Sequence, residues 1–190
     1  MQSGSSDGFA NDLIFERVDN ISALVDFSCG LEDIDHFIHE ELEDYACHGS
    51  CQLYLVKEGD EVIAMFCLDN SSLNLSEMAK EKMQEGKKPV PQHSPEPDSP
   101  YWWQTFYEAV EITYLAVAKT RQHRHIGSFI VEKIMQYVAE HKAYKADFVT
   151  VRAFQKQDYS AVPFYQRCGF YLAEPLVEDK NIFMYRIVMR

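Results

Sequence analysis

The stretch EITYLAVAKTRQHRHIG, residues 111–127, passes from an apolar run through a short basic loop into the start of an amphipathic segment. The apolar run predicts a buried strand over Ala109 to Ala118, and the end of the stretch predicts a helix that begins near Ile126. The first N–H groups of such a helix have no acceptor within the helix, and the positive end of the helix dipole lies behind them. This junction therefore predicts a binding place for a phosphate-bearing ligand.

Basic side chains surround this junction, although the chain as a whole is acidic. It has 30 acidic and 18 basic residues and a formal net charge of -12. This balance disfavours a general nucleic-acid or anionic-membrane binder, because most of the surface would repel phosphate. A local basic cluster in such a chain indicates a specific anion site, and its members are Arg121, His123, Arg124 and His125.

Length and composition are typical of one globular domain. The chain has 190 residues, of which 46% are hydrophobic and 25% charged, so we expect a single domain over residues 1–190 that is large enough to bury a core. Its opening residues, MQSGSSDG, lack the apolar run of a secretory signal. No apolar stretch reaches the roughly 20 residues that span a bilayer. We therefore expect a soluble, cytoplasmic protein without a membrane partner.

The cysteines do not form a metal-binding pattern. There are five, an odd set without a CxxC pair or the histidine spacing of a zinc site. We expect free thiols in a reducing compartment and no metal cofactor. Cys168 leaves two alternatives, an acyl-cysteine nucleophile or a buried inert thiol, and the second is favoured because no partner histidine is evident.

Segments with the apolar pattern of a strand and segments with that of a helix follow one another along the chain, and this order predicts a mixed α/β sheet. Two N-terminal strands form a hairpin, joined by a polar connection that contains Gly59. Gly169 is expected to end the last helix in the left-handed conformation. The predicted strands are Leu13 to Val18, Gln52 to Lys57, Val62 to Leu68, Ala109 to Ala118, Ala146 to Phe154 and Asn181 to Val188, and the predicted helices are Leu31 to Tyr45, Gly127 to His141 and Tyr159 to Arg167.

A proline-rich insertion at about residues 70–106 separates the two halves of this pattern. Its segment PVPQHSPEPDSP holds five of the seven prolines, which remove amide donors and predict an exposed loop. The aromatic residues that follow suit either a lid or partner surface, or simple packing of the loop against the sheet, which is favoured. They are Tyr101, Trp102, Trp103, Phe106 and Tyr107.

Three short motifs follow one another in the second half of the chain. LAV at 115–117 precedes the loop QHRHIG at 122–127, and the pattern D-x-x-A-x-x-F-Y-x-x-x-G-F follows at 158–170. In this order they resemble the GNAT superfamily of N-acetyltransferases, whose pyrophosphate motif is Q/R-x-x-G-x-G/A. His125 stands at the middle glycine of that motif, and Asp158 stands where the family frequently has asparagine.

The resemblance implies a fold and a co-substrate, acetyl-CoA. The fold is α/β, with a mixed, mostly antiparallel central sheet that is splayed between its fourth and fifth strands and flanked by helices. Acetyl-CoA would lie in the wedge, with its pantetheine arm on the fourth strand and its pyrophosphate on the loop amides. The cofactor-binding residues that the resemblance implies are Leu115, Ala116, Val117, Gln122, His123, Arg124, His125, Ile126, Gly127, Ser128, Asp158 and Tyr165.

Acetyl transfer to a primary amine by direct attack in a ternary complex needs two further groups, one that accepts the amine proton and one that protonates the departing thiolate. The resemblance places Tyr165 at the family's usual tyrosine acid. The alternative role of Tyr165 is aromatic packing under the second helix. Glu111 lies where some members have a glutamate base that acts through water. Glu108 and His123 are alternative bases, and Glu111 could equally be a surface carboxylate.

The segment FSCGLEDIDHFI, residues 27–38, resembles the start of a branch that includes aminoacyl-tRNA-acetylating toxins. Those toxins generally need a basic surface for RNA, so the acidity of this chain makes tRNA the less favoured acceptor. An amine-bearing small molecule, peptide or protein is favoured. The departures at His125 and Asp158 leave a noncatalytic acyl-CoA-binding or protein-interaction module as the alternative. A homodimer through the sheet end or the aromatic loop stays open.

Overall fold

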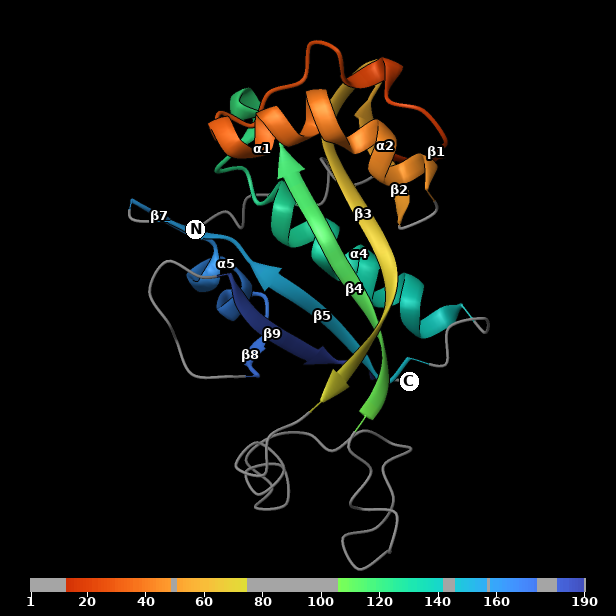
Figure 1. Cartoon of the computed structure of the whole chain (residues 1–190), viewed down its shortest axis with the longest axis vertical. Coiled ribbons are helices and arrows are strands. Elements are labelled where there is room, and N and C mark those ends of the chain that lie inside the picture. Colours follow the sequence, from red (N-terminus) through yellow and green to blue (C-terminus); the bar gives the residue numbers. More distant parts are fainter. Residues whose placement is uncertain are drawn as a thin grey trace, which may run out of the picture. The chain divides into compact units, whose positions relative to one another are not determined.

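The computed structural model describes residues 13–48, 51–74, 106–141, 146–156, 158–173 and 181–189. Within them a seven-stranded sheet has the order β1-β2-β3-β4-β5-β9-β8, and β6 pairs with β7 (Figure 1). The strands are β1 (Leu13–Val18), β2 (Gln52–Glu58), β3 (Glu61–Asn74), β4 (Phe106–Val117), β5 (Phe148–Ala153), β6 (Gln155–Lys156), β7 (Tyr159–Ser160), β8 (Tyr171–Leu172) and β9 (Ile182–Ile187). The helical elements are η1 (Ser22–Leu24), α1 (Glu32–His36), η2 (Phe37–Glu41), α2 (Leu42–Cys47), η3 (Lys119–Arg121), α4 (Ile126–Glu140) and α5 (Val162–Arg167).

The sheet is mostly antiparallel, and its parallel pairing joins β4 to β5. This register covers residues 109–112 of β4 and 148–151 of β5, whereas β4 itself continues to Val117. On its other side β5 pairs antiparallel with β9 from Phe148 to Ala153. The arrangement confirms the expected mixed α/β fold with its mostly antiparallel sheet.

Two compact units can be distinguished, and each has its own core. Unit 1 comprises Met1–Asp69 and Thr113–Ile130, and unit 2 comprises Asn70–Ile112 and Val131–Arg190. Strands β3 and β4 and helix α4 each contribute residues to both units. The prediction of one acetyltransferase-like domain over 1–190 stays a prediction.

The core of unit 1 lies between the segment α1-η2-α2 and the strands β2, β3 and β4, which Figure 1 shows side by side. Phe37, Ile38 and Leu42 are buried from the helical side. The predicted helix Leu31 to Tyr45 is therefore present, but it is interrupted by the π-helical turn η2, in which the Leu42 N–H donates to the Phe37 carbonyl. A π-helical turn accommodates one extra residue, so the helix face that packs on the sheet shifts between α1 and α2.

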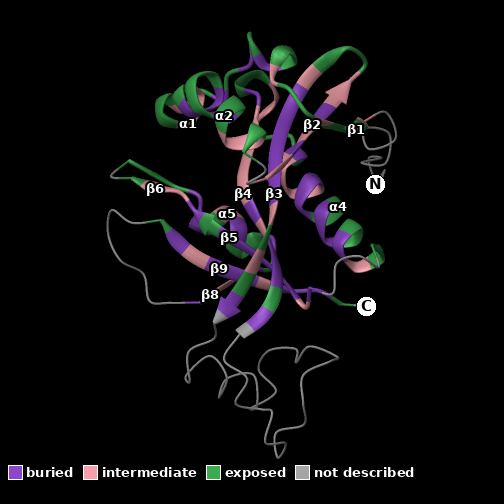
Figure 2. Ribbon diagram, turned by 45° about the vertical axis from the view of Figure 1, so that its right-hand side comes forward, coloured by how far each residue is buried: buried purple, intermediate pink, exposed green. Residues whose placement is uncertain are grey.

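Helix α4 has one buried and one exposed face, which Figure 2 shows as purple and green stripes along it. Its bounds lie within one residue of the predicted helix Gly127 to His141. The burial follows from apolar residues at helical spacing, which place one stripe against the core. The buried members are Ile126, Ile130, Val131, Ile134, Met135 and Val138.

The predicted helix Tyr159 to Arg167 is wrong in its first part. Tyr159 and Ser160 form β7, and α5 begins at Val162 with a proline in its first turn. Pro163 lacks an N–H and clashes with a preceding helical turn, so it is tolerated only near a helix start. The predicted end is confirmed, since Gly169 follows with φ +81.

The described strands bound the proline-rich insertion more narrowly than predicted. Residues 70–74 continue β3, and Phe106 begins β4. Tyr101, Trp102 and Trp103 lie outside the described residues. Tyr107 packs in the core of unit 2, where its ring meets that of Phe148 edge-on at 5.3 Å between centroids. Of the two alternatives for these aromatic residues, Tyr107 therefore fits packing within the fold rather than a lid or partner surface.

Candidate functional site

The predicted anion-binding loop joins β4 to α4 in unit 1. After Val117 the chain passes through η3 and reaches α4 at Ile126. The Phe129 N–H donates to the His125 carbonyl at 3.0 Å, which is the first hydrogen bond of the helical ladder. The N–H groups of residues 126–128 come before this bond and therefore have no acceptor within the helix. With the helix dipole behind them, they suit an anionic group.

Two non-glycine residues of this loop have left-handed backbones. His123 and His125 both have φ 61, a conformation that costs an ordinary residue about 1–2 kcal/mol. His125 therefore keeps the backbone conformation that the middle glycine of the motif reaches without strain. Left-handed residues in such turns bring N–H groups to one side and form anion-binding concavities. Ser128 secures this turn, because its hydroxyl donates to the His125 carbonyl at 2.9 Å.

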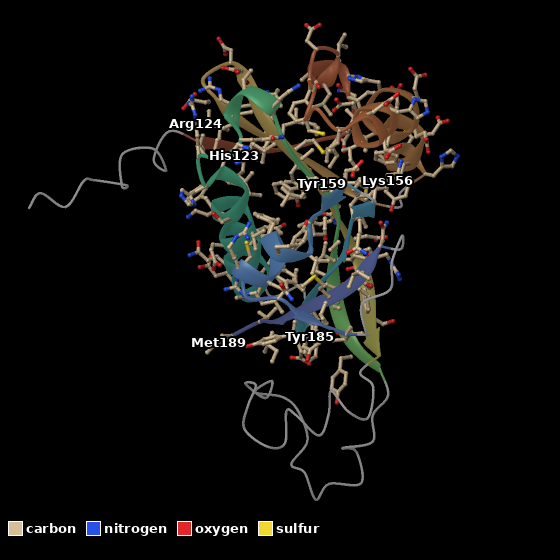
Figure 3. All side chains as sticks on the ribbon, turned by 90° about the vertical axis from the view of Figure 1, so that its left-hand side faces the viewer. His123, Arg124, Lys156, Tyr159, Tyr185 and Met189 are labelled. Atoms are coloured by element: carbon tan, nitrogen blue, oxygen red, sulfur yellow. The ribbon has the colours of Figure 1, made fainter. Side chains whose placement is uncertain are left out.

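The side chains of the loop divide into exposed and engaged groups. His123 and Arg124 are exposed and lie at the surface near the start of α4 (Figure 3), and His125 is exposed as well. Gln122 is engaged: its side-chain amide donates to the Val117 carbonyl at 3.0 Å and to the Cys29 carbonyl at 2.8 Å. The loop is thus fixed both to the end of β4 and to a turn far away in the sequence.

Arg121 is held by the β2-β3 hairpin. Its guanidinium lies 2.9 Å from Glu58 and also pairs with Glu61. A hydrogen bond from Arg121 holds the pKa of the Glu61 carboxyl below its usual range. The sequence prediction counted Arg121 among the charges that meet the anion, but these carboxylates neutralise it. Arg121 therefore fixes the loop rather than adding free positive charge.

A second support of the loop is the turn at residues 28–30. The Asp35 carboxylate accepts hydrogen bonds from the Ser28 hydroxyl at 2.6 Å, the Cys29 N–H at 2.7 Å and the Gly30 N–H at 3.1 Å. Burial alone would raise the pKa of Asp35, but these hydrogen bonds outweigh it and lower the pKa. The Lys119 N–H donates to the Ser28 carbonyl at 2.9 Å. The FSCG segment is therefore part of the loop's support.

Sequence reasoning missed these supports. It interpreted residues 27–38 only through their resemblance to the start of a family branch, and it did not predict that Asp35, Glu58 or Glu61 supports the loop. A signal was available in the spacing, because Gly30 comes just before a helix start and a carboxylate follows within the first helical turn. The pairings themselves span 60 residues for Arg121 with Glu61 and 93 for Gln122 with Cys29, and local patterns carry no information on them.

Replacing Gly30 with alanine is expected to lower the free energy of unfolding by about 2 kcal/mol. Gly30 has φ +80, and an added Cβ would lie 2.8 Å from Cδ of Lys119. The matched control is Gly59→Ala, because Gly59 has φ +61 with nothing within 4 Å of the added atom, so it bears the backbone cost alone. Urea unfolding of both variants measures the difference. Equal losses would show that the Lys119 side chain moves aside at no cost.

The strand residues of the predicted site also lie in unit 1. Ala116 is buried, and Leu115 and Val117 are half-buried at the end of β4. The chain continues with Ala118, whose N–H donates to the Ile63 carbonyl on β3 at 2.9 Å. One continuous segment, residues 115–128, therefore carries both the strand and the loop residues that the sequence analysis proposed for cofactor binding.

Tyr165, the candidate acid, lies in α5 of unit 2. It is 5% exposed, and its ring meets those of Phe164 and Phe170 edge-on at 4.9 and 5.4 Å between centroids. Burial raises the pKa of Tyr165, and the nearby Tyr159 and Cys168 raise it further. The phenol therefore stays protonated over the neutral range. This state suits a proton donor, while the ring contacts suit the packing alternative equally.

Glu111, the candidate base, lies on β4 in unit 2. The Ser71 hydroxyl donates to one carboxylate oxygen at 3.0 Å, and Nε of Arg152 lies 3.4 Å from the other. The Glu111 side chain is 14% exposed, so it is not a simple surface carboxylate. Arg152 also lies over the ring of Phe183 at 5.0 Å. The alternatives Glu108 and His123 are exposed.

The remaining candidates differ in what surrounds them. Asp158 is exposed in unit 2, just before β7. Cys168 is buried, and burial raises the pKa of its thiol against the opposing effect of Arg186. A thiol with a raised pKa is a poor nucleophile at neutral pH, which favours the inert alternative. The Arg186 guanidinium donates a hydrogen bond to the backbone carbonyl of Cys168 at 2.8 Å.

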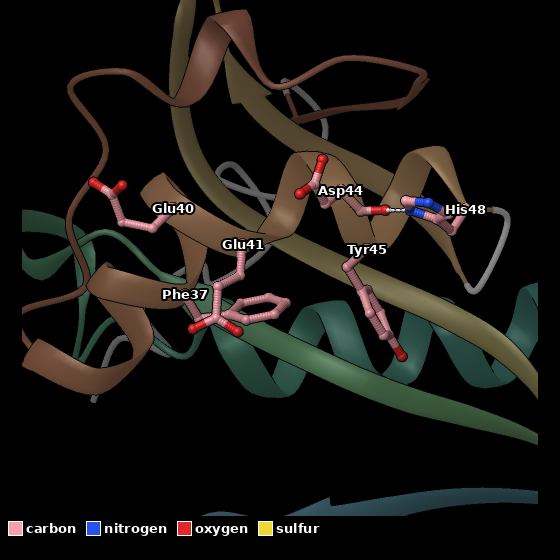
Figure 4. A pocket seen from close by; sticks show the side chains of 6 residues that line it. All are labelled: Phe37, Glu40, Glu41, Asp44, Tyr45 and His48. Carbon is pink, nitrogen blue, oxygen red and sulfur yellow. Dashed lines mark hydrogen bonds between the residues drawn. The ribbon is translucent and has the colours of Figure 1, made fainter.

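A shallow hollow of about 380 Å³ opens on the helical segment of unit 1 (Figure 4). Two aromatic rings line it, and both contact Tyr114: Phe37 stacks on Tyr114 at 3.8 Å with 8° between the planes, and Tyr45 meets Tyr114 edge-on. Three carboxylates stand at its rim. The lining residues are Phe37, Glu40, Glu41, Asp44, Tyr45 and His48.

Two features are absent from the described part of the chain. Among those residues no group of three or more His, Cys, Asp or Glu side chains is placed to hold a metal ion. Within the same residues, no helix combines the length and the apolar character that crossing a membrane requires.

Comparison with known proteins gives one family and a set of similar structures. The model of the acetyltransferase (GNAT) family matches residues 23–170. No curated protein matches the sequence. AtaT complexed with acetyl-methionyl-tRNAfMet is 19% identical with a TM-score of 0.63, covering 93% of this chain and 95% of that chain. AtaTR bound with AcCoA is 21% identical with a TM-score of 0.63, covering 91% and 92%. A mutant of KacT is 21% identical with a TM-score of 0.63, covering 91% and 94%.

Proposed function

The chain belongs to the acetyltransferase (GNAT) family, and from this premise we propose that it is an acetyl-CoA-dependent N-acetyltransferase acting on a primary amine. The observation that carries the proposal is the loop of residues 122–128. It combines a helix N-terminus, a left-handed His125 and anchors at both sides, which is the arrangement a pyrophosphate needs.

The residues present fit acetyl-CoA. The N–H groups of residues 126–128 precede the helical ladder of α4 and would hold the pyrophosphate, with Arg124 exposed beside them. The main chain of residues 115–117 would meet the pantetheine arm. Acetyl-CoA supplies the acetyl thioester. His125 does not block this use, because its φ of 61 lies in the left-handed region that glycine readily adopts, and its imidazole is exposed.

Two side chains of unit 2 would move the protons of the reaction. The amine nitrogen attacks the acetyl carbon, the C–S bond breaks, and the amine loses a proton. We assign proton acceptance to the Glu111 carboxylate, acting through water, and proton donation to the Tyr165 hydroxyl. The buried phenol retains its proton at neutral pH, and Ser71 and Arg152 keep the Glu111 carboxylate in a fixed orientation.

Charge favours a cationic acceptor over a nucleic acid. The chain has a net charge of -12, and Glu40, Glu41 and Asp44 surround the hollow on the helical segment. Carboxylates over aromatic rings repel phosphate and attract ammonium groups. AtaT, a similar structure, is complexed with acetyl-methionyl-tRNAfMet, so an aminoacyl-tRNA belongs in the acceptor screen. We propose an amine-bearing small molecule, peptide or protein as the acceptor.

The test of this function is calorimetry with acetyl-CoA and with CoA, followed by a turnover screen. The screen contains diamines, lysine-bearing peptides and an aminoacyl-tRNA, and it measures release of the CoA thiol. Micromolar binding with turnover on one acceptor supports the proposal. Binding without turnover on any acceptor would favour a noncatalytic acyl-CoA-binding module. Absence of binding at millimolar acetyl-CoA would refute the enzyme.

Replacing Glu111 with glutamine is expected to lower kcat at neutral pH by roughly 100-fold, because the amide cannot accept the amine proton. Glutamine keeps the shape of the side chain and its bond with Ser71. The matched controls are Glu108→Gln and His123→Gln, which remove the alternative bases. We expect both to retain kcat within about threefold of the wild type when acetyl-CoA is saturating, because His123 also lies in the loop proposed to bind acetyl-CoA. A large loss in either control together with an active Glu111 variant would move the base to that residue.

A further inference from the structure

We propose that Asp35 is a positioning residue for the acetyl-CoA loop: through the turn at residues 28–30 it fixes the backbone that holds residues 119–122. The inference rests on the proposed function for the identity of the ligand. With this role, the FSCG segment and the start of α1 contribute to acetyl-CoA binding by fixing the loop.

The Asp35 carboxylate holds two consecutive peptide groups by their N–H ends. One oxygen accepts the Cys29 N–H at 2.7 Å, and the other accepts the Gly30 N–H at 3.1 Å. The same second oxygen accepts the Ser28 hydroxyl at 2.6 Å, and that hydroxyl in turn accepts the Gly30 N–H at 3.1 Å. Hydrogen bonds to a charged acceptor are roughly twice as strong as neutral ones, so this turn has a preferred orientation.

The loop holds the same two peptide groups by their carbonyl ends. The Ser28 carbonyl accepts the Lys119 N–H at 2.9 Å, and the Cys29 carbonyl accepts the Gln122 side-chain amide at 2.8 Å. No peptide bond in the described residues is cis, and in a trans peptide the N–H and C=O point in opposite directions. Each of the two peptide planes is therefore fixed at one end by Asp35 and at the other by the loop.

This geometry makes the loop sensitive to Asp35 without a direct contact. If the carboxylate is lost, the peptide planes can rotate and the two carbonyls no longer have a single orientation. Hydrogen bonds in series also polarise one another, so the carboxylate strengthens both carbonyls as acceptors. Gln122 links the Cys29 carbonyl to Val117, the last residue of β4. A rotation at the turn would therefore reach the loop at both its beginning and its middle.

The experiment compares Asp35→Asn with Glu32→Gln. Glu32 is an exposed carboxylate on the same short helix, so its variant has the same change of charge without the turn contacts. Two quantities are measured: hydrogen exchange of the Lys119 amide by NMR without ligand, and the acetyl-CoA dissociation constant. For Asp35→Asn we expect faster Lys119 exchange and roughly tenfold weaker acetyl-CoA binding. In steady state the KM for acetyl-CoA rises while kcat changes little.

The results separate this inference from the proposed function. A wild type that does not bind acetyl-CoA refutes the proposed function, and the Lys119 exchange still decides whether Asp35 fixes the loop. Unchanged exchange and affinity in Asp35→Asn, or equal losses in Glu32→Gln, would overturn the positioning role. If Asp35→Asn does not fold, Ser28→Ala replaces it. This variant removes the hydroxyl and leaves the peptide groups, so we expect the same two effects at smaller size, and their absence would overturn the role.

Discussion

Replacing Tyr165 with phenylalanine is expected to lower kcat for acetyl transfer by roughly 10²- to 10⁴-fold, with little change in the affinity for acetyl-CoA. In the proposed reaction the Tyr165 hydroxyl protonates the departing thiolate, and burial keeps that hydroxyl protonated by raising the pKa of Tyr165. Phenylalanine retains the ring, so the edge-on contact with Phe170 is kept. The measurement is thiol release with an acceptor from the screen, paired with calorimetry.

Tyr185→Phe is the matched control for this variant. Tyr185 is a fully buried phenol of the same unit, and burial raises its pKa to about 12. Tyr185→Phe also removes a phenol hydroxyl, and the proposed reaction does not use the hydroxyl of Tyr185. We expect turnover within about threefold of the wild type once both variants are shown to be folded. Wild-type turnover in Tyr165→Phe would leave Tyr165 with aromatic packing alone.

Replacing Gly127 with glutamate is expected to weaken acetyl-CoA binding by roughly 100-fold or more. Gly127 lies in the first turn of α4, where the proposal places the pyrophosphate. A carboxylate there repels the phosphates and can bond the same N–H groups. The fold should persist, because an acidic residue in a first helical turn stabilises a helix by about 0.3–1 kcal/mol. Calorimetry with acetyl-CoA and with CoA measures the loss.

Gly127→Gln separates charge from size in this test. Glutamine has the shape of glutamate without its charge, so it should retain most of the affinity if the N–H groups bind an anion. Raising the ionic strength should reduce the gap between the two variants, because salt screens exposed charges. If both variants lose binding equally, the site rejects any side chain at residue 127. If neither variant loses it, the pyrophosphate binds elsewhere.

The sequence was most informative where a local pattern decides the structure. The first strand was predicted at both of its ends, Leu13 and Val18, because a polar turn at Asp19 and Asn20 follows its apolar residues. The start of α4 at Ile126 was predicted because the apolar spacing changes from strand to helix there. The junction of β4 and α4, and with it the position of the candidate site, follows from this change of spacing after the apolar run of β4.

The sequence was least informative where distant residues meet. The charges that neutralise Arg121 and the carboxylate that holds residues 28–30 become neighbours only through the fold. The π-helical turn η2 was missed because apolar spacing in a helix tolerates one extra residue. β7 was missed because Tyr159 and Ser160 have no alternating pattern long enough to separate a strand from a helix start. The roles of Glu111, Asp158 and Tyr165 stay predictions that the variants above test.

The way the insertion joins the sheet has a consequence for how relatives of this protein can diverge. β3 ends at Asn74 and β4 begins at Phe106, and these strands are antiparallel neighbours (Figure 1). The chain leaves and re-enters the sheet at adjacent strand ends, so this stretch can lengthen, shorten or be exchanged without altering strand order. Diversification can therefore concentrate here, while the β4-α4 loop, anchored by Gln122, has little room to vary.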